Sequence, residues 1–316
     1  MNQMNVTNKR INGQDNWFDF RVKEKPQSTI LDNFRVIDGR KFHNVENSPY
    51  SFPIDEISNY NHDVQHDIYK EIWGENFSSP VHEILKLRNA KVLDCGCGSG
   101  KWIKEMAIAY PNSTFIGIDL SVSLTPDGNE KPLNAGFLEV NIIEGLPFPD
   151  NTFDYIFQRN MISAFNDSQW PIIVKEYSRV LKPGGYLELC EYNIKSDNLV
   201  YSGKLLNESV KGHFESYGFT PILAYLLPVF LEKSKEFKPT VVMEKEIRIG
   251  SWGGELGERV VDCMILSWST CKIIVQAILN IDDDEFEKLL NDFFNESKDI
   301  RNRMSIKTFR VYGRKQ

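Results

Sequence analysis

The feature that most constrains this chain is a glycine-rich turn between a short apolar run and an amphipathic run. The turn lies within the segment Val92-Leu93-Asp94-Cys95-Gly96-Cys97-Gly98-Ser99-Gly100. It follows a predicted strand at 91–94 and precedes a predicted helix at 101–110. Glycines let the backbone approach a ligand closely, and we expect amides at the start of the helix to be free to donate to it. Many nucleotide-binding folds share such a turn.

The centre of the chain alternates strand and helix patterns. Strands are predicted at 91–94, 114–119, 136–140, 153–158 and 186–191, with helices at 101–110 and 169–181. Short apolar strands separated by helices predict βαβ units and a buried parallel sheet. Val241–Ile249 and Ser305–Tyr312 alternate apolar and polar residues, which predicts an antiparallel pair closing one edge. The expected fold class is α/β: a Rossmann-like, doubly wound, mostly parallel sheet with N-terminal and C-terminal helices forming a lid.

Three regions are expected along the chain. Residues 1–55 are polar and predict an irregular arm, disordered over about the first fifteen residues. Residues 56–90 form a predicted helical cap, with helices at 61–73 and 82–87. Residues 91–316 form the main domain, with helical insertions at about 200–235 and 252–300. The second insertion is expected to hold one helix at 256–279 and another at 283–295.

Composition excludes several classes of partner. The net charge is −7 and the chain has no Lys/Arg cluster, which disfavours nucleic acid. No apolar run is long enough to cross a bilayer, and the N-terminus lacks the apolar core of a secretory signal, so we expect no membrane and a cytoplasmic or nuclear location. The five scattered cysteines predict reduced thiols and no metal site. The sequence gives no indication of oligomeric state.

The spacing around the turn predicts the kind of ligand. The glycines follow G-x-G-x-G, and Lys101 stands where a dinucleotide site needs its third glycine. Asp94 precedes the first glycine by two residues, where a carboxylate suits a cationic amine better than a pyrophosphate. Asp119 ends the next strand, where a carboxylate can accept from both ribose hydroxyls. An amino acid joined to a nucleoside is predicted, and S-adenosylmethionine is that ligand.

Four ordered motifs resemble the class I S-adenosylmethionine-dependent methyltransferases. They are the turn, Gly117-Ile118-Asp119, the segment 145–154 (GLPFPDNTFD) and the segment 176–187 (EYSRVLKPGGYL). Gln65-His66 and the segment 76–81 (NFSSPV) are similar to fungal methyltransferases related to the regulator LaeA, and the resemblance covers most of residues 60–316. Cys95 departs from the more usual Val or Ile, and Asn141 stands where many relatives carry Asp.

The resemblance implies a set of cofactor-binding residues. Asp94, Gly96, Cys97, Gly98 and Gly100 are expected around the methionine half of S-adenosylmethionine. Further along the chain, Asp119 and Leu120 are expected at the ribose and adenine, Asn141 and Ile142 at the adenine edge, and Gln158 facing the methyl group.

Methyl transfer from a sulfonium is an in-line displacement, and a general base is needed only if the acceptor must lose a proton. The candidates are His66, Glu191 and Tyr192, against the alternatives that His66 packs or caps its helix and that Glu191 is merely solvated. The segment 158–161 (QRNM) lacks the [DNS]-P-P-[YF] motif of adenine-type enzymes. Neither a Pro-Cys nucleophile for cytosine nor the double-Glu loop of protein-arginine enzymes is visible, so we expect a small, partly apolar metabolite.

Two other functions are compatible with parts of the sequence. The resemblance to LaeA-like proteins implies a regulatory or scaffold protein that keeps the cofactor site but acts through protein partners. A nicotinamide oxidoreductase is disfavoured by the G-x-G-x-G spacing.

Overall fold

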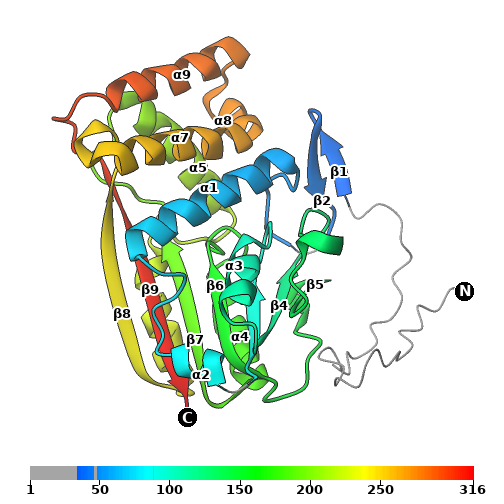
Figure 1. The fold of residues 1–316 in the computed structure, drawn as a ribbon. Coiled ribbons are helices and arrows are strands. Elements are labelled where there is room, and N and C mark those ends of the chain that lie inside the picture. The colour runs from blue at the N-terminus through cyan, green and yellow to red at the C-terminus, as the bar shows by residue number, and fades with distance from the viewer. Residues whose placement is uncertain (1–33, 46–47, 88) are drawn as a thin grey trace, which may run out of the picture.

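The computed structural model describes residues 34–45, 48–87 and 89–316, and its centre is a seven-stranded sheet (Figure 1). The strand order is β5-β4-β3-β6-β7-β9-β8. The five parallel strands are β3 (Lys91–Cys95), β4 (Thr114–Asp119), β5 (Ala135–Glu139), β6 (Phe153–Arg159) and β7 (Leu181–Tyr192). The two antiparallel strands are β9 (Ser305–Lys315), beside β7, and β8 (Phe237–Arg248), at the edge. The predicted fold class is confirmed.

The two faces of the sheet have separate hydrophobic clusters, as side-chain alternation requires. Val92, Tyr155 and Phe157 point to the face covered by α2 (His82–Leu87) and α3 (Lys101–Ala109). Leu93 and Ile156 point to the other face, which α4 (Trp170–Val180) covers. The face toward which a residue points therefore decides whether it reaches α3 or α4.

Most of the remaining helices gather at the carboxyl ends of the parallel strands, where α1 crosses beneath α5 and α7 to α9 (Figure 1). The helices other than α2, α3 and α4 are α1 (Glu56–Trp73), α5 (Tyr201–Ser216), α6 (Leu227–Ser234), α7 (Gly254–Thr270), α8 (Lys272–Leu279) and α9 (Asp283–Glu296). Of these, α6 packs beside α4 and against β8, so it belongs to the layer that covers the α4 face. Asp55 caps the start of α1 by accepting a hydrogen bond from the Ser58 amide, so this helix begins earlier than predicted.

The arm before α1 is more regular than expected over its described part. Strands β1 (Phe34–Ile37) and β2 (Arg40–His43) form an antiparallel hairpin. The predicted disorder of the first fifteen residues lies outside the described residues.

The single helix expected at 256–279 is wrong, because the chain bends by 73° between Thr270 and Lys272. The hydroxyls of Ser267, Ser269 and Thr270 donate back to carbonyls of their own helix, a pattern that bends helices. Of the helices in the described residues, none is both long and apolar enough to cross a membrane unbroken, and only the bent pair 251–270 and 272–279 reaches that length and composition together.

Candidate functional site

Two adjoining cavities open at the carboxyl ends of the strands. The first, which we call the turn cavity, has a volume of about 130 Å³ and lies over the glycine turn between β3 and α3. The second, the lid cavity, has a volume of about 210 Å³ and lies between α1, α5 and α7. The residues that line both are Tyr50, Ser58, His62, Gln65 and Asn160. The two cavities therefore meet along one side of α1.

The glycine turn is held against β4 by its own amides. Gly96 and Cys97 donate to the Ile118 carbonyl, and Gly98 donates to the Asp119 carboxylate at 2.9 Å. These amides of the turn itself are therefore already paired within the protein, whereas the expected freedom of the amides at the start of α3 stays a prediction. Gly96, Cys97 and Gly98 still line the turn cavity, and Gly96 and Gly98 have φ angles of 75° and 53°.

A side chain at either glycine would enter occupied space. A Cβ at Gly96 would lie 2.1 Å from Sδ of Met161, and one at Gly98 would lie 3.1 Å from Nδ1 of His62. Gly100 does not line the cavity, contrary to its predicted role. A Cβ there would lie 2.7 Å from the Phe137 ring, so this glycine allows close packing at the start of α3.

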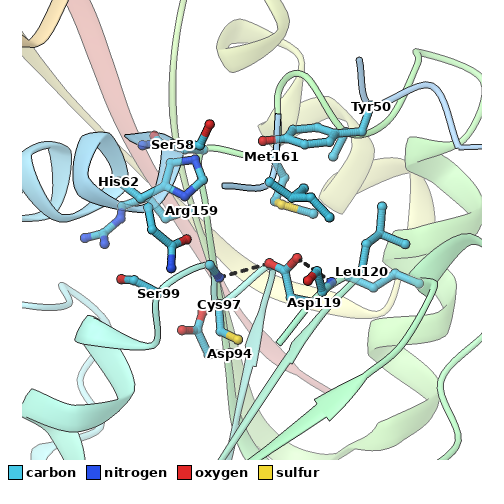
Figure 2. A pocket seen from close by; sticks show the side chains of 18 of the residues that line it. Tyr50, Ser58, His62, Asp94, Cys97, Ser99, Asp119, Leu120, Arg159 and Met161 are labelled. Atoms are coloured by element: carbon cyan, nitrogen blue, oxygen red, sulfur yellow. Dashed lines mark hydrogen bonds between the residues drawn. The ribbon is translucent and has the colours of Figure 1, made fainter. Parts of the chain in front are cut away.

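Two acidic side chains, Asp94 and Asp119, lie beside the turn near Cys97 (Figure 2). Asp94 is the next-to-last residue of β3, is 3% exposed and lines the cavity, and burial raises its pKa to about 7. Asp119 ends β4 and also accepts a hydrogen bond from the Ser121 amide at 3.3 Å. Each of its carboxylate oxygens keeps a lone pair for a further donor. Burial raises the pKa of Asp119 as well.

Beyond Asp119, the wall of the turn cavity consists of apolar side chains and the side-chain amide of one asparagine. Leu120, Asn141 and Ile142 all line the turn cavity, and their predicted contacts with a nucleoside stay a prediction. The side-chain oxygen of Asn141 accepts from the Ile143 amide at 3.2 Å, while its amide group donates to Glu144 at 2.9 Å. Asn141 therefore also caps the short helix at 142–144.

Gln158 does not reach either cavity, so its predicted position facing the ligand is wrong. It shares the face of Ile156 and is fully buried, with its oxygen accepting from the Tyr177 hydroxyl at 2.5 Å and its amide donating to Glu191. The next residue, Arg159, points to the opposite face and lines the turn cavity. A one-residue difference along a strand reverses the face, which explains the error.

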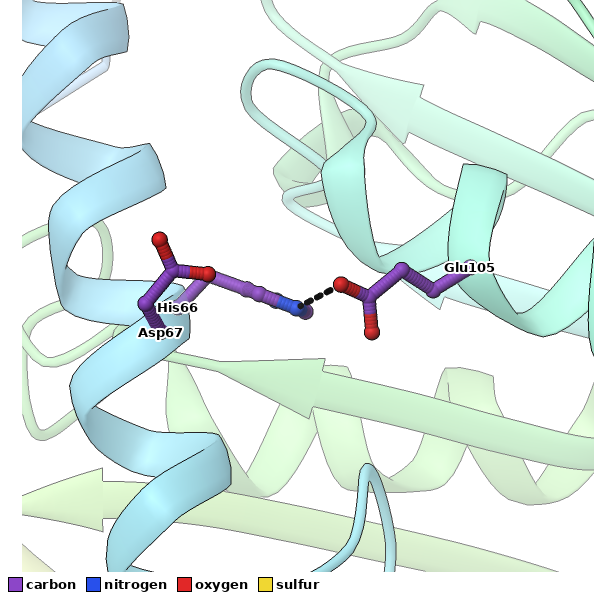
Figure 3. Close-up of side chains that lie close together, drawn as sticks. All are labelled: His66, Asp67 and Glu105. Carbon is purple, nitrogen blue, oxygen red and sulfur yellow. Dashed lines mark ion pairs between the residues drawn. The ribbon is translucent and has the colours of Figure 1, made fainter.

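His66 lies at the turn cavity, but both of its ring nitrogens have close neighbours. Arg159 donates to Nδ1 at 2.9 Å, and because a guanidinium only donates, the proton of the neutral ring is on Nε2. Nε2 is 3.2 Å from a Glu105 oxygen (Figure 3). Burial, together with the Arg159 charge, lowers the pKa of His66 to about 4. A free lone pair for base catalysis is therefore lacking, and His66 supports Arg159.

The cluster of His66, Asp67 and Glu105 brings three ligand-type atoms within 4.8 Å of one another. Lys101 pairs with Asp67 at 2.7 Å and Lys70 pairs with Glu105 at 2.8 Å. These ammonium groups neutralise both carboxylates, so we interpret the cluster as an ion-pair network joining α1 to α3. The predicted lack of a metal stays a prediction.

The other two candidate bases lie in different surroundings. Glu191 is fully buried, lines neither cavity, and accepts from the backbone amides of Met161 and Ile162 at 2.8 and 3.1 Å. Burial raises its pKa to about 8. Instead of being solvated at a strand end, Glu191 holds the loop after β6 in place. Tyr192 lines the lid cavity, and burial raises its pKa.

Sequence reasoning missed His62, Arg159 and Tyr50. His62 is one helical turn before His66 and therefore on the same side of α1, a spacing that the sequence displays. Among the described residues, no group hydrogen-bonds to the buried Nδ1 of His62, and burial lowers its pKa. Tyr50 belongs to the arm before α1. The sequence indicated it only as an aromatic residue in a polar segment.

The lid cavity carries no formal charge. Apolar side chains make up much of its wall, among them Ile68, Val210, Phe214, Ile247, Val260 and Ile306. None of its described lining residues is Asp, Glu, Lys or Arg. Three buried polar atoms of that lining have no hydrogen-bond partner in the described part of the chain: Nδ1 of His62, Oδ1 of Asn160 and Oγ of Ser196. Unpaired buried polar atoms are uncommon and fit a ligand that would hydrogen-bond to them.

Comparisons with known proteins agree with this geometry. Residues 92–185 match the model of a methyltransferase domain. The chain is 33% identical over 158 residues to the secondary metabolism regulator laeA of Coprinopsis cinerea, covering 49% of this chain and 38% of that protein. It is 30% identical over 224 residues to the methyltransferase pytC of Aspergillus terreus, covering 70% and 63%. The chain thus spans less than two thirds of either relative.

Among solved structures, a phosphoethanolamine N-methyltransferase 2 of Haemonchus contortus aligns with a TM-score of 0.49 at 17% identity, over 87% of this chain and 62% of that one.

Proposed function

We propose that this chain, which resembles the LaeA-like members of the class I S-adenosylmethionine-dependent methyltransferases, methylates a small, partly apolar metabolite. The observation that carries the proposal is the pair of adjoining cavities, one suited to the cofactor and one uncharged. In-line transfer needs the acceptor atom and the methyl group on one axis, and adjoining cavities supply that arrangement.

The turn cavity suits S-adenosylmethionine. The buried carboxyl of Asp94 gains a counter-charge from the cofactor's amine, which relieves the cost of ionising it. Asp119 accepts from the ribose hydroxyls, while Leu120 and Ile142 flank the adenine and Asn141 meets its edge. Gly96 and Gly98 provide the cradle that a Cβ would fill. When bound, the cofactor supplies an electrophilic methyl group on a sulfonium.

The lid cavity suits an uncharged acceptor. Its apolar wall would bury the body of the molecule, and a charged acceptor would find no opposite charge among the described lining residues. The unpartnered atoms of His62, Asn160 and Ser196 would hydrogen-bond to its polar groups. We therefore place an uncharged molecule with hydroxyl or N–H groups there.

His62 is the residue placed to accept a proton from such an acceptor. It lines both cavities, so its ring lies beside the place where the acceptor would meet the cofactor (Figure 2). Its lowered pKa keeps the ring neutral near pH 7, as a base requires. Tyr192 forms part of the acceptor wall. For an acceptor that needs no deprotonation, His62 would only hydrogen-bond and exclude water.

The first test is calorimetric titration with S-adenosylhomocysteine, the demethylated product. We expect micromolar binding, weakened about tenfold or more in Asp119→Asn, because an amide cannot accept with both of its polar atoms. The second test supplies methyl-labelled cofactor with a metabolite extract and follows label in the small-molecule fraction. Cys263→Phe, which narrows only the lid cavity, should abolish labelling while S-adenosylhomocysteine affinity stays within about twofold. Failure of the wild type to bind S-adenosylhomocysteine would refute the proposal.

A regulatory function is the second candidate, favoured by the 33% identity to a laeA regulator. On that hypothesis the cofactor still binds, but label from the methyl donor does not enter small molecules. Affinity capture from the same extract would then recover one dominant protein partner, and Cys263→Phe would leave that capture unchanged.

A further inference from the structure

Arg159 is a cation at the turn cavity without an anionic partner. Among the described residues, no carboxylate forms an ion pair with it, and its hydrogen bond goes to a neutral histidine, His66. Its guanidinium carbon lies 5.5 Å from the centre of the Tyr69 ring and 5.9 Å from that of Phe157. The aromatic rings and the His66 imidazole leave some N–H groups of this partly buried guanidinium without an acceptor. These N–H groups can donate to an anion.

The other cation of the turn cavity has its partner. Lys101 pairs with Asp67 at 2.7 Å and its ammonium also lies 3.4 Å from the Asp63 carbonyl. Asp94 and Asp119 are the two acidic residues of the described lining, and an ionised carboxylate has no hydrogen to donate to an anion. Within the described lining, Arg159 is therefore the cation that has no carboxylate partner and could pair with an anionic group of a ligand.

Sheet register places Arg159 close to Asp94. Asp94 on β3 pairs with Phe157 on the neighbouring strand β6, and Arg159 is two residues further on the same face. Neighbouring strands lie about 4.8 Å apart, so a diagonal pair on one face is within reach of long side chains. A carboxylate and a guanidinium at this spacing match the amine and carboxylate of one α-amino acid.

The geometry points to Arg159 as the group that binds the carboxylate at the methionyl end of the cofactor, opposite Asp94 at the amine. This assignment rests on the proposed function and names a binding residue within it. Arg–carboxylate pairs form two parallel hydrogen bonds, which fix orientation as well as adding affinity. His66 and Tyr69 then act as positioning residues, because both contact the guanidinium group. Figure 2 shows Arg159 and His62 on the side of the turn away from Leu120.

Calorimetry with two probes tests the assignment without any measurement of activity. The probes are S-adenosylhomocysteine and its decarboxylated analogue, which keeps the amine and the nucleoside. Wild-type protein should bind the complete compound about ten- to a hundredfold more tightly. Arg159→Gln keeps an N–H for His66 but not the charge. It should remove that preference by weakening S-adenosylhomocysteine, with the analogue changed less than about twofold.

Lys101→Gln is the matched control, because it removes the other cation of the same cavity. It should retain the preference for the carboxylate-containing probe. Equal weakening of both probes in Arg159→Gln would overturn the assignment, since a merely structural role moves them together. Loss of the preference in Lys101→Gln would overturn it as well. Wild-type protein that binds neither probe would instead refute the proposed function, so the two failures are distinguishable.

Discussion

Replacing Asp94 by Asn should stabilise the ligand-free protein while damaging its cofactor site. Asp94 is 3% exposed, and burial raises its pKa from 3.8 to about 7. The fold therefore disfavours the ionised carboxylate, and the change corresponds to roughly 4 kcal/mol at most. Asparagine has almost the same shape and no charge, so it removes this cost. Residues that a functional site needs often lower the stability of the folded protein.

The pH dependence gives the prediction its sign. Below about pH 4 the carboxyl is protonated in both folded and unfolded chains, and the variant gains nothing. As the pH rises toward about 7, the unfolded chain ionises while the fold keeps the proton, so wild-type stability falls relative to Asp94→Asn. Above about pH 7 the difference stays constant. The free energy of unfolding should therefore favour the variant by a few kcal/mol at pH 8 and by much less at about pH 5.

Urea unfolding followed by circular dichroism across this pH range measures the difference. Glu105→Gln is the contrasting control: hydrogen bonds to Lys70, Asn76 and His66 outweigh its burial and lower its pKa to about 2. Removing that ionised carboxylate should destabilise the protein at neutral pH, the opposite direction. In parallel, Asp94→Asn should weaken S-adenosylhomocysteine at least about tenfold. A variant that is less stable than wild type by the same amount at both pH values would refute the reasoning.

Further outcomes are expected. His66→Ala should weaken S-adenosylhomocysteine about tenfold by freeing Arg159, which calorimetry checks. The His66 ring of the wild-type protein should stay neutral until the pH falls to about 4, which NMR titration of that ring checks. Gly96→Ala should lose cofactor binding through its positive φ and its clash with Met161, and adding Met161→Ala should restore part of the lost thermal stability. His62→Gln should leave S-adenosylhomocysteine affinity within about twofold yet slow transfer to a hydroxyl acceptor by about a hundredfold or more in single-turnover assays.

The sheet was predictable because its signals are local. Apolar runs bounded by turns located all five parallel strands, and the glycine turn with Asp94 and Asp119 located the cavity over it. It was harder to predict from the sequence which side chains at the strand ends point into that cavity. Gln158 and Glu191 end their predicted strands, yet both point to the α4 face and bind each other. Sequence alone does not set the face at a strand's last residue, where both layers are already covered by helices.

The histidines of α1 illustrate a different difficulty. His62 and His66 follow each other by one helical turn, so periodicity puts both on one side of the helix. The roles of the two histidines differ because their side chains contact different parts of the protein. His66 lies under the Arg159 guanidinium, which consumes its lone pair, whereas His62 lies at the junction of the two cavities. Only the long-range contact between α1 and the last residue of β6 separates a supporting residue from a candidate base.

The two cavities are lined by different parts of the chain, and this difference bears on specificity for the methyl acceptor. Most of the cofactor-side wall lies within the matched residues 92–185, which include the glycine turn and Asp119. The lid cavity takes only Asn160 and Ser163 from that range; the rest of its lining comes from the arm, α1, the segment after β7, α5, α7, α8, β8 and β9 or their flanks. Similarity over the matched range therefore bears on the cofactor and carries no acceptor over from a relative. We expect exchanges of lining residues on α5 and α7 to change which molecule is methylated while S-adenosylhomocysteine affinity stays constant, since those helices contribute nothing to the turn cavity.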